Sequence, residues 1–359
     1  MISKIQNALL IQTAFIGDVV LTTPMIAAFR KHFPEARLTV MVKPEAVSIL
    51  RNNPDVHELL VIDKKGAHRG LIGMLRMIRA IRSKKFDVLL SPHKSHRTGF
   101  LALASGIPRR IGYSGAGFAR LAYHRRLARP ENQPEIERLL LFLQQAAPRV
   151  ITESDTQNAS RELKIYVDDQ ARSDARALLS RLDAVRPILL APSSVWPTKR
   201  WTPWGFAELI IKLTETYHKP VLLIGSKGDR KIADEVLRFL KLSHPDWEGR
   251  GKVHNICGDT SLPALYALME KSLLLVSNDS APVHFGCAAG IPVVAIFGPT
   301  VPALGYAPIA PRSAVAQLEY LECRPCGTHG ARACPLDHFR CMKDLSADQI
   351  MSVLEKVMR

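Results

Sequence analysis

The chain has 359 residues, a length that predicts about two domains. Hydrophobic residues make up 47% and charged residues 23%, which excludes the disordered, collagen-like and low-complexity classes. The 49 Lys and Arg residues against 33 Asp and Glu give a net charge of +16, which indicates anionic partners: phosphorylated substrates, nucleic acid or an acidic lipid surface.

The excess positive charge lies in one part of the first half. Between Lys64 and Arg129 the sequence contains sixteen Lys or Arg residues and a single acid, Asp87. We therefore expect an acidic partner to bind this part of the chain.

Targeting and membrane-spanning segments are not expected. The first residues lead directly into an apolar run and lack a small-residue cleavage site. Residues 280–311 carry no Asp, Glu, Lys or Arg, but five prolines between Pro282 and Pro308 interrupt them, which predicts buried strands and loops. We expect a cytoplasmic protein.

Short β-branched runs alternate with helical stretches along the chain, which is typical of parallel α/β folds. In the first half we expect strands at 8–12, 37–42, 58–62, 86–90 and 110–113, and helices at 19–32 and 70–83. After a polar helical stretch at 168–183, we expect strands at 187–191, 220–225, 255–257, 273–277 and 293–297, and helices at 204–217, 227–240, 262–269 and from Ser346, a candidate N-cap, onward. Two such series predict two Rossmann-like domains that face each other, with a crevice at the carboxyl ends of the strands.

The first candidate site follows the first strand. Residues 13–20, TAFIGDVV, bring a glycine and Asp18 to the start of a helix, where a carboxylate acts either as a catalytic base or as a helix cap. The three spaced glycines of a dinucleotide-binding loop are absent, and residues 225–229 are too short to supply them, so an NAD-dependent enzyme is not expected.

Two further candidate sites follow strands in the second half. Residues 192–201, PSSVWPTKRW, combine hydroxyls and two cations, which suit a diphosphate; the alternative is a solvated turn packed by its two tryptophans. Residues 276–284, VSNDSAPVH, end a strand and open a helix whose amides could bind an anion near His284, although such a sequence also caps helices. A charged Asp279 in the most apolar part of the chain favours a function, because burying it is costly without a partner.

Several motifs resemble one enzyme family. They are Phe15-Ile16-Gly17-Asp18 with Thr22-Thr23-Pro24, Asn278-Asp279-Ser280-Ala281-Pro282, and Phe297-Gly298-Pro299-Thr300. In this order and spacing they resemble the heptosyltransferases of lipopolysaccharide core synthesis, glycosyltransferase family 9, from Ala8 to about Leu345. The match is fuller to the type II branch, which adds the second heptose.

The resemblance implies an α/β fold of the GT-B class and a metal-independent, inverting reaction. The acceptor would bind an N-terminal domain, 1–180, and ADP-heptose a C-terminal domain, 181–345, followed by a helix at 346–359. Asp18 matches the family's proposed general base, and Lys199 the lysine on the donor diphosphate. The donor-binding residues implied are Ser193, Ser194, Asp229, Thr260, Asp279, Ser280, Ala281 and His284.

The basic region is expected to receive the acceptor, the Kdo and heptose sugars on lipid A, which are rich in carboxylates and phosphates. The candidate residues are Lys64, Lys65, His93, Lys94, His96, Arg97, Arg109, Arg110 and Arg120. The helix at 70–83 could also lie on the inner leaflet of the membrane; packing against its own sheet is the alternative use of its apolar side.

Four cysteines cluster near the C-terminus: Cys323, Cys326, Cys334 and Cys341. In a cytosolic protein this spacing favours a structural zinc site over disulfides, with His329 and His338 as further possible ligands. Reduced thiols or a local disulfide are the alternatives. Cys257 and Cys287 lie in apolar contexts and are expected to be core residues.

The sequence thus predicts an enzyme that transfers L-glycero-D-manno-heptose from ADP-heptose to the lipopolysaccharide inner core, without a cofactor, at the cytoplasmic face of the inner membrane. One alternative is another family 9 transferase with a different donor or acceptor. A second, from another class, is a basic nucleic-acid-binding protein; because no nucleic-acid-binding motif is evident and aromatic residues make up only 6%, nucleic acid is not expected as a partner.

Overall fold

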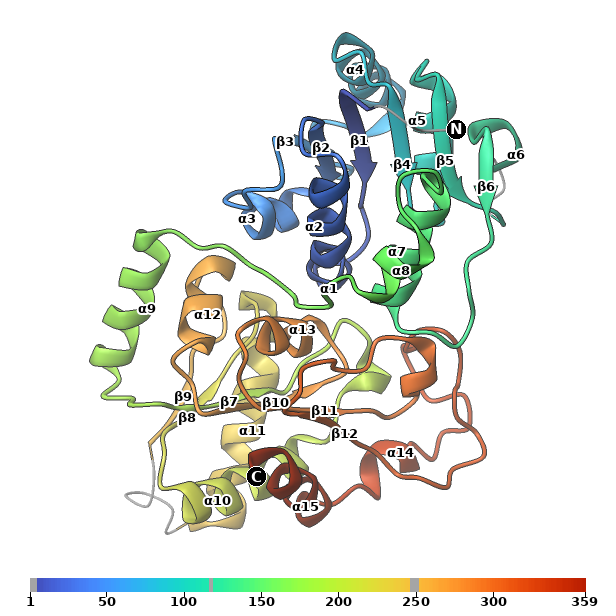
Figure 1. The fold of residues 1–359 in the computed structure, drawn as a ribbon. Helices are drawn as coiled ribbons and strands as arrows, with labels where there is room; N and C mark the ends of the chain where they lie inside the picture. The colour runs from blue at the N-terminus through green and yellow to red at the C-terminus, as the bar shows by residue number, and fades with distance from the viewer. Residues whose placement is uncertain (1–4, 116–118, 246–251) are drawn as a thin grey trace. The chain divides into compact units, whose positions relative to one another are not determined.

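The computed structural model describes residues 5–115, 119–245 and 252–359 (Figure 1). The chain forms two compact units, Met1–Tyr166 and Val167–Arg359. Each is a parallel sheet flanked by helices, so the predicted α/β class with two Rossmann-like sheets is confirmed.

The first unit is built on a six-stranded sheet. Its strands are β1 (Asn7–Ile11), β2 (Arg37–Val42), β3 (Glu58–Val61), β4 (Val88–Ser91), β5 (Arg109–Tyr113) and β6 (Arg125–Leu127). Its helices are α1 (Ile16–Leu21), α2 (Thr23–His32), η1 (Pro44–Ala46), α3 (Val47–Leu50), α4 (Gly70–Ser83), α5 (His96–Ala104), α6 (Ala119–Ala122), α7 (Glu135–Ala146) and α8 (Glu153–Gln157). All strand pairs are parallel, in the order β3-β2-β1-β4-β5-β6.

The second unit repeats this topology. Its strands are β7 (Ile188–Ala191), β8 (Val221–Leu223), β9 (Val253–Asn255), β10 (Leu274–Asn278), β11 (Val293–Ile296) and β12 (Ser313–Ala316). Its helices are α9 (Asp169–Arg181), η2 (Pro197–Lys199), α10 (Pro203–Tyr217), η3 (Lys227–Asp229), α11 (Arg230–Ser243), α12 (Leu262–Met269), α13 (Ala281–Ala288), η5 (Pro302–Leu304), α14 (Arg340–Lys343) and α15 (Ala347–Met358). The strand order is β12-β11-β10-β7-β8-β9, again all parallel.

The order of the strands locates the binding edge of each sheet. Each sheet grows outward from its first strand in one direction and then continues on that strand's other side, so the direction reverses between β1 and β4 and between β7 and β10. Loops at the carboxyl ends of two such strands diverge, and ligands of doubly wound folds bind there. The three candidate sites of the sequence lie in these loops.

Apolar packing holds each sheet against its helices. In the first unit, Leu9 and Leu89 of the sheet belong to one buried cluster with Met77 and Ile81 of α4. In the second, α15 packs against α10, β11 and β12, and its Leu354 is fully buried. Within the described residues every helix is too short or too polar to cross a bilayer.

The predicted helix at 19–32 is wrong in one respect, because the structure has two helices that meet at Thr22. Pro24 has no N–H to continue the first helix and occupies the first turn of the second, where that N–H is not needed. The Thr22 hydroxyl donates instead to the Asp18 carbonyl, at 2.7 Å. The break gives Asp18 a short helix of its own.

The unit boundary differs from the predicted one at residue 180. Helix α9 packs against α12, and Arg172 Nη1 lies 2.5 Å from Glu270 Oε2, so α9 belongs to the second unit. The C-terminal helix α15 is likewise part of that unit and not a separate element. Strands β6 and β12 and helices α5 and α7 had no predicted counterpart.

Candidate active site

Asp18 lies in the first turn of α1, at the carboxyl end of β1. Its Oδ2 accepts a hydrogen bond from the Phe15 backbone N–H at 3.0 Å, so it does cap the helix. Burial raises the pKa of its carboxyl, and this effect outweighs the Phe15 N–H and the nearby Arg129 and Lys43, which lower it. A half-buried carboxylate with a raised pKa is a stronger base than an exposed one, so capping and catalysis are compatible here.

Three cations and one histidine gather at the same edge of the sheet, because each follows a strand end. Lys43 comes after β2, and its Nζ lies 5.3 Å from the centre of the Phe15 ring. Lys64 follows β3, and its Nζ donates to Thr13 Oγ1, 3.2 Å away. His93 follows β4 and Arg129 follows β6.

The pKa shifts of Lys64 and His93 show that these groups act on one another electrostatically. Burial lowers the pKa of Lys64, and Lys43 and Arg97 lower it further. Burial also lowers the pKa of His93 to about 4, with Lys64, Lys43 and Arg129 adding to the effect, so His93 is neutral at pH 7. Its Nδ1 is buried without a hydrogen-bond partner in the described residues. Because these cations repel one another, an anion bound among them would relieve the repulsion, which suits the cluster to an anionic ligand.

A buried ion pair, Glu135 with Arg138, holds Arg129 in this cluster. Arg129 Nη2 and Arg138 Nη1 both contact Glu135 Oε2, the latter at 3.1 Å, and Glu135 and Arg138 are almost fully buried. Burial raises the pKa of Glu135, and Asp18 adds to this, against the two arginines. The pair therefore fixes Arg129 where its charge reaches Asp18.

The structure does not bring all predicted acceptor residues to this edge. Lys64, Lys65, His93, Lys94, His96 and Arg97 lie in or next to the loops after β3 and β4. Arg109 and Arg110 lie at the amino end of β5, the opposite edge, and the Arg110 side chain donates to the carbonyls of Ala122 and Ile107. Arg120 is exposed on α6.

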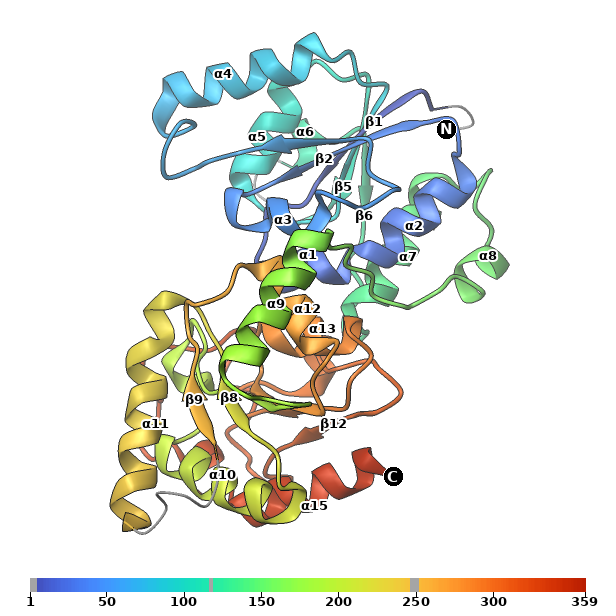
Figure 2. The same ribbon diagram turned by 90° about the vertical axis from the view of Figure 1, so that its left-hand side faces the viewer.

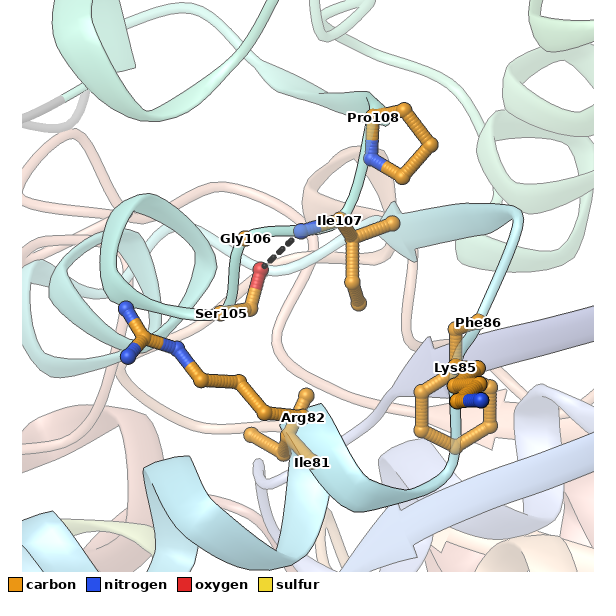
Figure 3. Close-up of a pocket in the computed structure, with 8 residues that line it drawn as sticks. All are labelled: Ile81, Arg82, Lys85, Phe86, Ser105, Gly106, Ile107 and Pro108. Atoms are coloured by element: carbon orange, nitrogen blue, oxygen red, sulfur yellow. Dashed lines mark hydrogen bonds between the residues drawn. The ribbon is translucent and has the colours of Figure 1, made fainter.

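A pocket of about 340 Å³ also lies at that opposite edge, away from Asp18 (Figure 3). It is lined by Ile81, Arg82, Lys85, Phe86, Ser105, Gly106, Ile107 and Pro108. Because it lies at the amino ends of β4 and β5, it is not part of the candidate active site.

In the second unit, Lys199 and Asp279 form an ion pair at the switch between β7 and β10. Lys199 Nζ lies 2.6 Å from Asp279 Oδ2, and Thr300 Oγ1 donates to the same oxygen at 2.7 Å. Asn278 joins the two loops: its Oδ1 accepts from Trp201 N and its Nδ2 donates to Pro192 O, each at 2.9 Å. Asp279 thus has the partners that its burial requires.

Helix α13 begins directly after this pair. Ser280 is its N-cap, and Ala281 and Pro282 open its first turn. Pro282 has no N–H and the Val283 N–H donates to the Ser280 carbonyl, so the N–H groups of Ser280 and Ala281 are the ones that an anion could meet at this turn. His284 is buried one turn on; burial lowers its pKa to about 4, and its Nδ1 has no hydrogen-bond partner among the described residues. A neutral His284 can accept or donate one hydrogen bond at this turn.

The remaining predicted donor residues line the same edge. Ser193, after β7, donates from Oγ to Asp229 Oδ1, after β8. Asp229 Oδ2 accepts from the Ser226 backbone N–H at 2.8 Å, so its carboxylate is already held. Ser194 is buried, and Thr260 is half-buried in the loop between β9 and α12.

The segment 323–341, which carries four cysteines, packs beside the turn that carries Lys199. Thr198 N and Oγ1 both donate to the Ala331 carbonyl, at 3.2 and 3.0 Å. Arg324 Nη2 donates to the Thr300 carbonyl at 2.8 Å. The segment therefore positions both side chains that bind Asp279 Oδ2.

All six cysteines lie in the described residues, and none forms a disulfide. Cys323 Sγ is 3.9 Å from His338 Nε2, and burial raises the pKa of Cys326 and that of Cys341, the latter to about 11. In the part of the chain that the structure describes, no three His, Cys, Asp or Glu side chains are arranged to hold a metal ion. A zinc site here stays a prediction from spacing.

Three residues of the candidate site were not singled out from the sequence: Lys43, Arg129 and Thr300. Lys43 directly follows a predicted strand, so the rule that carboxyl ends meet could have found it. Thr300 stands in a motif already singled out, without a role. Arg129 ends the basic region but was not singled out within it, because β6 was not predicted and its partner Glu135 lies in an unpredicted helix.

These features define a class of protein. Two Rossmann-like parallel sheets, one with a basic carboxylate and the other with a lysine and a helix start at their switch points, are the components of a GT-B glycosyltransferase. The pattern of glycosyltransferase family 9 (heptosyltransferase) matches residues 74–336. The chain belongs to this family and is a glycosyltransferase.

Individual relatives agree with the family. The chain is 25% identical to lipopolysaccharide heptosyltransferase 3 of Escherichia coli K12 over 79% of its length and 80% of that relative. It is also 25% identical to lipopolysaccharide heptosyltransferase 2 of the same strain, over 82% of its length and 83% of that relative. A family 9 glycosyl transferase from Veillonella parvula DSM 2008 has the same fold, with a TM-score of 0.85 at 23% identity, over 100% of this chain and 98% of that one. Family membership favours the enzyme over the nucleic-acid-binding alternative.

Proposed function

We propose that this enzyme transfers L-glycero-D-manno-heptose from ADP-heptose to the inner core of lipopolysaccharide, as a type II heptosyltransferase. The observation that carries the proposal is the placement of a carboxylate with a raised pKa at the switch point of one sheet, and of a buried lysine beside a helix start at that of the other. The relatives' names support the sugar and the acceptor. Types 2 and 3 match equally well, so the choice of type II depends on the sequence motifs.

In the proposed reaction an acceptor hydroxyl attacks the anomeric carbon of the heptose while the bond to the diphosphate oxygen breaks, which inverts that carbon. The Asp18 carboxylate takes the hydroxyl proton. The departing ADP gains negative charge, which Lys199 and the backbone N–H groups of Ser280 and Ala281 stabilise. Lys199 starts on Asp279, so the donor diphosphate has to share the ammonium group with that carboxylate.

Titration calorimetry with ADP, UDP and GDP, with and without EDTA, tests the donor. We expect selective ADP binding that EDTA leaves unchanged, since the proposed positive charge comes from Lys199 and backbone amides. A preference for UDP or GDP would keep the fold and overturn the donor, in favour of another family 9 activity.

We propose that the anionic acceptor binds the cluster beside Asp18, and that the enzyme works in the cytoplasm at the inner membrane, where a lipid-linked acceptor lies. Lys64→Gln with Arg97→Gln should raise the acceptor KM and leave the donor KM unchanged. The same measurement on Arg109→Ser with Arg110→Ser shows whether the acceptor reaches the opposite edge of the sheet. A change confined to the donor KM would contradict the assignment.

We propose no cofactor for the chemistry itself and retain zinc at the four cysteines as a structural proposal. Metal analysis of the purified chain should find about one zinc per molecule if the four thiols form one site. Zinc-free protein with all six thiols reactive after unfolding would reject it.

A further inference from the structure

Helix α4 carries large apolar side chains on its solvent side. Leu71, Ile72 and Leu75 are 72%, 69% and 53% exposed. At about 100° of rotation per residue they fall in one arc of about 100° on the helix surface. Figure 2 shows α4 along its length, with α5 in the same unit.

The hydrophobic core does not use this arc. Met77, Ile78 and Ile81 fall in the neighbouring arc of α4, which begins beside Leu71, and are buried against the sheet. The apolar surface of α4 therefore extends beyond the arc that the core covers, and Leu71, Ile72 and Leu75 stay exposed. Exposed clusters of this kind in a folded chain indicate a binding surface.

Cations share the exposed side. Arg76, Arg79 and Arg82 follow the three aliphatic residues along the helix and are exposed, and residues 70–83 contain no Asp or Glu. Arg82 extends from the end of α4 along the pocket drawn in Figure 3, which Lys85 also lines. The neighbouring helix α5, whose Ala104 carbonyl accepts from Arg82 Nε at 3.0 Å, exposes Phe100 and Leu103.

We propose that this α4 face docks the enzyme on a bilayer surface that contains anionic phospholipids. Aliphatic side chains beside arginines, with acids absent, match an interfacial helix that buries its apolar residues among acyl chains and holds lipid phosphates with its cations. The surrounding region 64–129, with sixteen basic residues and one acid, adds long-range attraction to the same surface.

The structure of α4 is what supports this docking surface. The role of the surface in the reaction rests on the proposed function, because a lipid-linked acceptor lies in a membrane. The two ideas fail separately. Vesicle binding is measured on the full chain without donor or acceptor, whereas transfer is measured with a water-soluble, deacylated acceptor.

The test is co-sedimentation with vesicles of phosphatidylglycerol and phosphatidylethanolamine, against vesicles of phosphatidylcholine alone. We expect binding to the anionic vesicles that weakens as salt rises. A triple variant, Leu71→Ser, Ile72→Ser and Leu75→Ser, should bind at least about tenfold more weakly, because each side chain loses its burial among acyl chains. Arg76→Gln with Arg79→Gln should also weaken binding and reduce its dependence on salt.

The matched control is a triple variant of equally exposed residues in the second unit, Val185→Ser, Leu242→Ser and Leu336→Ser, which should bind like the unchanged enzyme. Both triple variants should keep the circular dichroism spectrum, the melting temperature and the transfer rate on the water-soluble acceptor. Equal binding by the α4 variant, equal binding to neutral vesicles, or no vesicle binding by the unchanged enzyme would overturn the proposal. A dimer in sedimentation velocity that is lost in the α4 variant would also overturn it, since the face would then be a contact between copies of the chain.

Discussion

At the scale of single residues, Asp18 combines a cap with a base, and the two roles have opposite effects on stability. Its raised pKa means that the folded state binds its proton more tightly than the unfolded chain does. The resulting stability is present at low pH and is lost as pH rises through the folded pKa. We therefore expect Asp18→Asn to reduce turnover by about a hundredfold or more, to leave ADP binding unchanged, and to raise the melting temperature at pH 7.

Asp155 offers a control with the opposite sign. Asp155 is the third residue of α8, as Asp18 is of α1, and it accepts from Thr152 N at 2.9 Å. Here hydrogen bonding to Thr152 lowers the pKa of the carboxyl. Its stabilising effect is present at neutral pH and is lost on acidification, so Asp155→Asn should lower the melting temperature at pH 7 and spare turnover. Calorimetric melting of both variants compares the signs, and a stability loss in Asp18→Asn would show that the cap dominates.

Lys199 should contribute to both folding and donor binding. The Lys199 and Asp279 side chains are 13% and 8% exposed, and removing one partner of a buried pair costs about 3 kcal/mol. Lys199→Met should therefore reduce the free energy of unfolding by this order and weaken ADP binding. Adding Asp279→Asn should recover much of the stability but not the binding.

The control for Lys199 is Lys212, whose partner Asp348 is 78% exposed. Lys212→Met should change the free energy of unfolding by less than about 1 kcal/mol and leave ADP binding unchanged. Denaturant unfolding and ADP calorimetry on the same samples separate the two effects. Unchanged ADP affinity in Lys199→Met would remove the lysine from the donor site.

At the scale of elements, the docking of α15 depends on its cap. The Ser346 hydroxyl accepts from Gln349 N at 3.2 Å, and Gln349 Oε1 accepts from Ser346 N at 2.9 Å, which confirms the N-cap predicted from sequence. Ser346→Ala should destabilise the second unit by about 1 kcal/mol, and Ser346→Asp should restore most of that loss. Thermal unfolding measures both, and equal destabilisation by the two substitutions would show that the hydroxyl does not act as a cap.

Elements with strong patterns were predictable and weak ones were not. The strand 37–42 and the helices 70–83 and 262–269 have the predicted bounds, because apolar periodicity determines them. Strand β6 reads Arg-Arg-Leu and carries too little apolar pattern to be recognised. The helix break at Thr22 required weighing Pro24 as a start signal instead of as a tolerated interruption.

At the scale of the whole molecule, topology determined how much of the site the sequence could predict. Asp18, Lys199 and Asp279 could be singled out as candidates because strand ends in parallel sheets mark functional loops. Tertiary contacts between residues 50 or more apart in the chain, such as Lys64 with Thr13, decide which cations lie beside these candidates. Local sequence patterns cannot predict such contacts. For the same reason Arg109 and Arg110 were grouped with Lys64 by charge alone, although they lie at the other edge of the sheet.

Each unit also holds a neutral histidine at its candidate site, half-buried His93 in the first and buried His284 in the second, and this should make the whole molecule sensitive to acid. The folded pKa values of His93 and His284 are about 4, below the ordinary value of 6.5, so the unfolded chain binds their protons first as pH falls. Their cost is absent above the unfolded pKa and grows as pH drops toward 4, to about 3 kcal/mol for the more buried His284. We expect the free energy of unfolding, measured in urea, to fall steeply between pH 6.5 and pH 4. His284→Asn should flatten this fall, whereas substitution of the exposed His57 should leave it unchanged; a slope that His284→Asn does not alter would assign the acid sensitivity to other groups.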